Sequence, residues 1–152
     1  MFKNLLAVIA ALVLVLPAAA LGGSTRSETS LLREMNRVRA EHGLPQLTAD
    51  THLGRAAHAH SKEMLGSNVL QHGAFGGRMH QFNVTGRLVG ENLAWGAGAL
   101  GTAEGIVAAW LASPEHRANL LRPSFTRVGV GDLVGTFRGY TGAHVITADF
   151  AG

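Results

Sequence analysis

The chain of 152 residues contains no cysteine. Disulfide bonds, thiolate metal ligands, a cysteine nucleophile and lipid attachment through an N-terminal cysteine are therefore all excluded. An exported domain of this length can bury a sufficient core without disulfides, so the absence of cysteine is compatible with an extracellular protein.

Charged and aromatic residues are also scarce, at 15% and 6% of the chain, and the formal net charge is only +3. The arginines are scattered, without a basic run or interleaved aromatic residues, so we predict no nucleic-acid partner. No G-x-S-x-G motif is present, and no G-K-[ST] follows the glycines of residues 96–101. The sequence thus lacks the signatures of a serine-hydrolase elbow and of a phosphate-binding loop.

The N-terminus has the pattern of a secretory signal peptide. Lys3 precedes an apolar run over residues 5–16, Pro17 breaks it, and three alanines at 18–20 suit a signal peptidase. The run is shorter than the roughly 20 residues of a membrane span. We expect residues 1–20 to be removed on export, leaving a secreted or envelope-associated chain. A retained anchor is the alternative, and the membrane is expected as a partner only in that case.

After a short flexible leader (residues 21–28), one domain is expected over residues 29–152. Helical spacing predicts a first helix from Thr29 or Ser30 to Gly43, with three arginines facing outward: Arg33, Arg37 and Arg39. Asp50 is a good cap for a second helix that ends at Gly66. Residues 66–90 are rich in glycine and are predicted to form a long loop.

The C-terminal half changes from helical to strand patterning. A short strand is expected at residues 91–95, a helix capped by Thr102, and a short helix from Ser113-Pro114 to Leu121. From Arg127 onward the period is two, which predicts two antiparallel strands joined by residues 135–142. Helices first and strands late indicate an α+β domain.

Three side chains stand out as a candidate site: His72 in the glycine-rich loop, Glu91 and His116. Glu91 lies in GRLVGENLAWG and His116 in WLASPEHRANLL, both surrounded by turn and capping residues that fix side-chain direction. Two imidazoles and one carboxylate could form a His/Glu/His cleft and offer donors suited to Zn²⁺ or another divalent metal. The N-terminus of the helix after Ser113 disfavours a positive charge on His116, which would keep that imidazole neutral.

The order of these motifs resembles the CAP/SCP family, named after cysteine-rich secretory proteins, antigen 5 and pathogenesis-related 1 proteins. The resemblance runs from about Leu31 to Gly152 and is closest to the bacterial, cysteine-free, single-domain type. It rests on seven segments in order: NRVRAEHGLPQLTAD, AAHAHSKEM, the His72 loop, GENLAWG, WLASPEHRANLL, FTRVGVG and ITADFAG.

The resemblance implies a three-layer α-β-α sandwich around a small antiparallel sheet. It also implies a cleft of two histidines and two glutamates, which binds a divalent metal in some members. His72, Glu91 and His116 match three of these four positions. The second glutamate is expected three residues after Trp110, where this chain has Ser113, and Glu115 beside His116 is a possible replacement.

Two functions follow as hypotheses, and a third option is a stable scaffold whose ligand surface is the loop of residues 66–90. The first is a non-enzymatic extracellular binding module whose His72, Glu91 and His116 cleft takes an envelope component, a lipid or a protein. The alternative is a metal-assisted hydrolase of peptide or cell-wall bonds, with Glu115 as general base. No catalytic residue and no cofactor is assigned with certainty. Supporting roles are expected for four residues around the cleft: Asn92, Ser113, Glu115 and Asn119. His60, on the apolar side of the second helix, is expected to be a core histidine.

Overall fold

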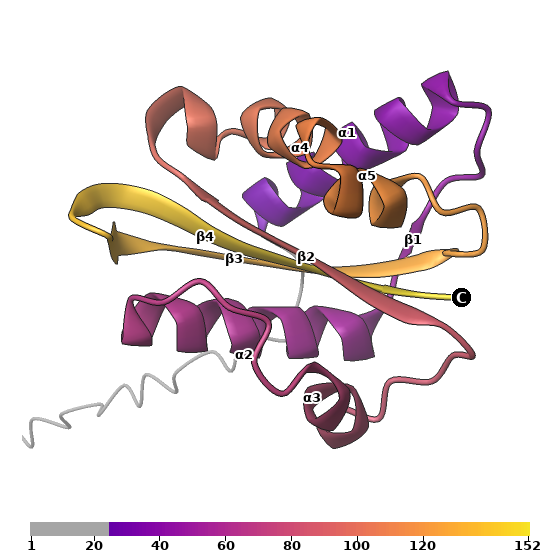
Figure 1. The fold of residues 1–152 in the computed structure, drawn as a ribbon, viewed down its shortest axis with the longest axis horizontal. Coiled ribbons are helices and arrows are strands. Elements are labelled where there is room, and N and C mark those ends of the chain that lie inside the picture. Colours follow the sequence, from indigo (N-terminus) through magenta and orange to yellow (C-terminus); the bar gives the residue numbers. More distant parts are fainter. Residues whose placement is uncertain (1–24) are drawn as a thin grey trace, which may run out of the picture.

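The computed structural model describes residues 25–152 (Figure 1). The predicted signal peptide and residues 21–24 of the predicted leader lie outside the described residues. The helices are α1 (Arg26–Glu41), α2 (Thr51–Ser67), α3 (Phe75–Gln81), α4 (Ala103–Ala112) and α5 (Pro114–Leu120), with a 3-10 helix η1 (Gly98–Gly101). The strands are β1 (Thr48–Ala49), β2 (Val89–Gly96), β3 (Arg127–Phe137) and β4 (Tyr140–Ala151).

The elements form three layers, with a four-stranded sheet between two groups of helices (Figure 1). The strand order is β1-β3-β4-β2, with β1 parallel to β3 and the other pairs antiparallel. Helices α2 and α3 lie on one side of the sheet, and α1, α4 and α5 on the other (Figure 1). The predicted α+β sandwich is therefore confirmed.

Three predicted helix starts have the expected capping residues. The Asp50 carboxylate accepts from the amides of His52 and Leu53, and the Thr102 hydroxyl accepts from Gly105. Ser113 is the N-cap residue of α5, but its side chain makes no capping hydrogen bond. Pro114 in the first turn is what defines the start of this helix.

The predicted start of the first helix is wrong by about one turn. Thr25 caps α1 and exchanges hydrogen bonds with Glu28, so a capping box places the helix start before residues 29 and 30. Residues 26–28 thus belong to α1 rather than to a flexible leader.

Arg39 does not face outward as its charge had suggested, but is fully buried. Its guanidinium donates to four backbone carbonyls, those of Pro45, Leu120, Arg122 and Phe125. Because these carbonyls lie after α1, at the end of α5 and between α5 and β3, Arg39 fixes the position of α5 against α1.

Glycines allow α2 to approach β3 very closely. A Cβ atom at Gly129 would lie 2.0 Å from the backbone carbon of Leu53, and one at Gly131 would lie 2.4 Å from that of Ala57. The intervening Val128 and Val130 pack in the core on the α1 side. Valine and glycine alternate in β3 because the valines fill the core on one face of the sheet, while the glycines let α2 come close on the other.

Two further elements differ from the sequence predictions. The connection between β3 and β4 is only Arg138-Gly139, both with positive φ, so the strands extend through much of the expected 135–142 loop. The long glycine-rich loop contains α3. Within residues 25–152 no helix is long and apolar enough to cross a membrane.

Candidate functional site

The site is built around Glu91 on β2, a strand at the edge of the sheet. Glu91 pairs in register with Asp149 of β4, so the two side chains leave the same face of the sheet. That face is the one covered by α2, because Leu93, two residues along β2, packs with Met64 of α2. The Glu91 side chain is only 2% exposed and Asp149 is fully buried.

His72, from the loop between α2 and α3, contacts this carboxylate directly. Its Nδ1 lies 2.6 Å from Glu91 Oε1, while its side chain remains 59% exposed. The following Gly73 has a φ of +57°, a left-handed turn that glycine permits and that directs the loop back toward β2. Because Nδ1 faces the protein, Nε2 on the far side of the ring is left for a ligand.

Arg78 of α3 is the third member of the cluster, and sequence analysis did not identify it. Its guanidinium forms an ion pair with Glu91 Oε2 and lies 4.0 Å from Asp149 Oδ1. A further Arg78 nitrogen donates to the His72 carbonyl at 3.4 Å. The Arg78 side chain is 8% exposed, so it acts on the site from inside the protein.

One cation therefore faces two buried carboxyl groups. Burial raises the pKa of Glu91 to about 7, although Arg78 opposes this shift. Burial raises the pKa of Asp149 to about 8, and the neighbouring Glu91 charge raises it further. No hydrogen-bond donor among the described residues reaches either Asp149 oxygen, other than the proton that the two acids can share.

His116 approaches the same site from α5. The Asn92 amide donates to the His116 carbonyl at 2.9 Å. Asn119 Nδ2 in turn donates to the Glu91 carbonyl and to Asn92 Oδ1, both at 3.1 Å. These bonds hold α5 against β2 behind the Glu91 side chain. Burial lowers the pKa of His116, and electrostatic repulsion from the His72 ring acts in the same direction, which favours a neutral imidazole.

The three predicted residues thus lie in one region of the structure, but only two of them are in direct contact. His72 and Glu91 are hydrogen-bonded, whereas no direct bond joins the His116 ring to either of them in the described part of the chain. Ser113 is half-buried at the start of α5, and Glu115 is exposed. The Glu115 charge partly opposes the lowering of the His116 pKa. The Glu115 side chain makes no hydrogen bond or ion pair within residues 25–152.

His60 is a buried histidine, 1% exposed, as its position on α2 suggested. Its Nε2 lies 2.8 Å from the Gln71 carbonyl, next to His72, and Nδ1 lies 3.2 Å from Glu63. Its Nε2 is also 3.9 Å from Glu91 Oε2, so His60 closes the inner side of the cluster.

The donor set does not fit the divalent metal that His72, Glu91 and His116 were expected to hold. One Glu91 oxygen faces His72 Nδ1 and the other is paired with Arg78. A metal ion at Glu91 would lie beside that guanidinium and be repelled by it. Consistently, residues 25–152 contain no group of three His, Asp or Glu side chains arranged to hold a metal.

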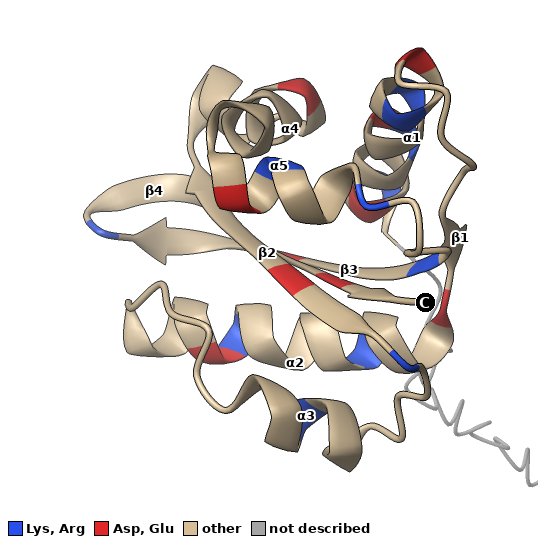
Figure 2. Cartoon of the chain, turned by 45° about the vertical axis from the view of Figure 1, so that its right-hand side comes forward, with Lys and Arg blue, Asp and Glu red and all other residues tan. Residues whose placement is uncertain are grey.

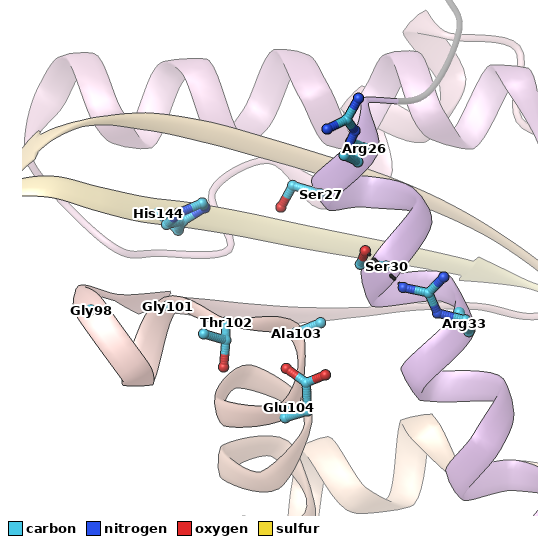
Figure 3. A pocket seen from close by; sticks show the side chains of 10 residues that line it. All are labelled: Arg26, Ser27, Ser30, Arg33, Gly98, Gly101, Thr102, Ala103, Glu104 and His144. Atoms are coloured by element: carbon cyan, nitrogen blue, oxygen red, sulfur yellow. Dashed lines mark hydrogen bonds between the residues drawn. The ribbon is translucent and has the colours of Figure 1, made fainter.

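A cavity of about 490 Å³ lies elsewhere, between the start of α1, β4 and the start of α4 (Figure 3). Its wall includes His144, which is an odd number of positions from Asp149 on β4 and thus faces the opposite side of the sheet. The cavity contains none of the predicted cleft residues. Lysines and arginines are spread over several helices rather than gathered on one element (Figure 2).

Comparison with known proteins now bears on this arrangement. Residues 32–150 match the model of the CAP family, described as the cysteine-rich secretory protein family. The chain belongs to the CAP family. The resemblance drawn from the sequence motifs is therefore confirmed, and the layered fold around Glu91 is that of a CAP domain.

Individual relatives support this assignment. The Bacillus subtilis protein YkwD is 35% identical over 109 residues, which cover 68% of this chain and 41% of YkwD. The membrane protein YlbC of the same organism is 32% identical over 112 residues, covering 70% of this chain and 32% of YlbC. The CAP domain described here thus spans well under half the length of these two relatives.

Solved structures share the fold. An extracellular protein with an SCP domain from Bacillus anthracis superposes with a TM-score of 0.65 at 31% identity, covering 82% of this chain and 40% of its own. An outer surface protein of Borrelia burgdorferi gives a TM-score of 0.69 at 23% identity, covering 84% of this chain and 93% of its own. At that identity the second likeness concerns the CAP fold alone.

Proposed function

We propose that this chain is an exported CAP-domain binding module that takes a polar envelope component at the cleft of His72, Glu91 and His116. The observation that carries the proposal is an exposed imidazole held in one orientation. His72 is 59% exposed, yet its Nδ1 is fixed by a carboxylate that is itself held by buried Arg78. A surface histidine that binds no ligand does not need buried groups to hold its ring in one orientation.

The chemistry of the cleft favours a hydrogen-bonding ligand. His72 presents Nε2, and the lowered pKa of His116 favours a neutral ring that can both donate and accept. Hydroxyl and amide groups of a glycan or peptide polymer match such groups better than an acyl chain does. Export is supported by the signal-like N-terminus and by the similar extracellular protein of Bacillus anthracis.

A metal-assisted hydrolase is less well supported. It needs a metal ligand set that the Arg78-paired Glu91 does not offer, and a general base at Glu115, which is exposed and held by no recorded bond within residues 25–152.

The test is co-sedimentation of the purified domain with insoluble peptidoglycan sacculi. We expect the wild type to bind and the His72→Ala/His116→Ala double variant to lose most of that binding. His80→Ala is the matched control, because His80 is exposed on α3 and close in sequence to Arg78. Unchanged binding by the double variant would contradict the proposal. Binding to acidic phospholipid vesicles but not to sacculi would assign the cleft to a lipid instead.

A further inference from the structure

We propose that the Arg78 guanidinium is the resident cation of the cleft. In this account it holds the place between Glu91 and Asp149 that a divalent metal ion would need, and it keeps such ions out. The metal preference of the cleft is independent of which envelope component it binds.

The first support is the position of the guanidinium. Arg78 is paired with Glu91 Oε2, lies 4.0 Å from Asp149 Oδ1, and donates toward the His72 carbonyl. Its Cζ lies 5.6 Å from the centre of the Phe75 ring, which covers it. A side chain that is 8% exposed and held on these sides cannot swing into solvent to admit an ion without opening α3.

The second support is the charge of the surroundings. Two buried carboxyl groups, Glu91 and Asp149, face one another across neighbouring strands. In a metal site the single cation beside two acids is usually a bound ion. Here the cation is a side chain of the protein itself. Buried charges must be compensated, and among the described residues Arg78 is the arginine or lysine that contacts these two acids.

The third support is the set of donors that would remain if the guanidinium were removed. Glu91 would regain a free oxygen, and both Asp149 oxygens are already without a partner. His72 Nδ1 lies 2.6 Å from Glu91 Oε1, whereas His60 Nε2 donates to the Gln71 carbonyl and is not a donor for a metal. Two carboxylates and an imidazole suit Zn²⁺ or Mn²⁺. With Arg78 in place, no three such side chains in residues 25–152 are arranged to hold a metal, so these groups have to close around the ion once the guanidinium is gone. Replacing Arg78 by a neutral side chain should therefore create a divalent metal site.

The experiment measures Zn²⁺ and Mn²⁺ binding by calorimetry and thermal unfolding on untagged protein, with a chelator to reverse the effect. The variants are Arg78→Met, which keeps length without charge, and Arg78→Lys, which keeps the charge. We expect Arg78→Met to bind metal at least about tenfold more tightly than the wild type, because the like charge beside the ion is removed. Arg78→Lys should behave as the wild type does.

Two controls separate the cleft from ordinary surface binding. Arg87→Met removes an exposed arginine and should leave metal binding unchanged. Glu91→Gln in the Arg78→Met background should abolish the gained affinity, which assigns it to the cleft rather than to surface histidines.

Arg78→Met leaves two acids without a cation, so its folding is checked directly. A variant that folds only when Zn²⁺ is added supports the proposal, because metal binding then replaces the arginine. If it does not fold even then, Arg78→Met/Asp149→Asn, with one acid fewer, is measured, and a gain over the wild type is still expected. Two results would overturn the proposal. The first is that the wild type binds metal, that Glu91→Gln removes this binding and that Arg78→Met leaves it unchanged. The second is that neither Arg78→Met nor Arg78→Met/Asp149→Asn binds metal more tightly than the wild type.

Discussion

Glu91 of β2 and Asp149 of β4 are direct cross-strand partners whose carboxyl groups are both buried beside one arginine, Arg78. This relationship organises the cleft, since Glu91 holds His72 on its outer side and Arg78 on its inner side. With one cation for two acids, a proton shared between the acids brings the cluster to neutrality.

The first prediction concerns the pH dependence of stability. The pKa of Asp149 is raised to about 8 and that of Glu91 to about 7, so up to about pH 8 the folded chain binds more protons than the unfolded chain. The free energy of unfolding should therefore fall as pH rises through this range. His60 and His116, whose pKa values are lowered from 6.5, act in the opposite sense but only below 6.5.

Asp149→Asn tests this directly, because asparagine resembles the neutral acid and removes its titration. Denaturant unfolding from about pH 7 to 9 should show a flatter dependence for Asp149→Asn than for the wild type. An equally steep decline in the variant would show that the pair does not titrate as described.

Asn119 connects α5 to the Glu91 carbonyl and to the Asn92 side chain of β2. Asn119→Ala removes the bonds to the Glu91 carbonyl and to Asn92, and should cost about 1–2 kcal/mol. NMR amide shifts should change in residues 90–93 and 114–120 and hardly elsewhere. Gln81→Ala, at an exposed position of α3, is the control.

Arg39 satisfies four buried carbonyls, so its loss should be far more costly than that of an exposed arginine. Arg39→Met should lower the free energy of unfolding by about 3 kcal/mol or more, because the carbonyls stay buried without donors. Arg33→Met on the same helix should change it by about 0.5 kcal/mol or less. Similar values for the two would mean that Arg39 does not anchor α5.

Gly129 sets the distance between β3 and α2. Gly129→Ala should destabilise the domain by about 1–3 kcal/mol or more, since its Cβ would overlap backbone atoms of Leu53 and cannot be relieved by a side-chain rotation. Gly54→Ala is a suitable comparison, because no atom lies within 4 Å of the added Cβ there. Thermal unfolding of the two variants distinguishes close packing from a general effect of glycine.

Much of this arrangement was predictable from the sequence where the signal is local. Residues close together in the sequence predicted the caps at Asp50 and Thr102, Pro114 in α5 and the strands after Arg127. These features appear where expected. Helix α3 was missed because Gly76 and Gly77 weaken helical propensity, and β1 because two residues carry no period.

The site residues that escaped sequence analysis are those defined by tertiary contacts. Asp149 alternates with Phe150 and Ala148 like a solvent-facing residue, but both faces of this sheet are covered, so it is buried. Arg78 lies in a glycine-rich segment without any pattern, and only the folding of α3 against the sheet brings it to Glu91. A buried acid in a strand covered on both faces was the available signal that a cation must be nearby.

Glu91 holds His72 with Nδ1 inward, which leaves Nε2 for a ligand. Long-range ¹H–¹⁵N correlation spectra of the histidine side chains at alkaline pH measure this directly, because they identify which ring nitrogen carries the hydrogen. We expect neutral His72 to carry it on Nδ1 in the wild type and to lose this preference in Glu91→Ala. A hydrogen on Nε2 in the wild type, or the same tautomer in both proteins, would show that Glu91 does not fix the orientation of His72.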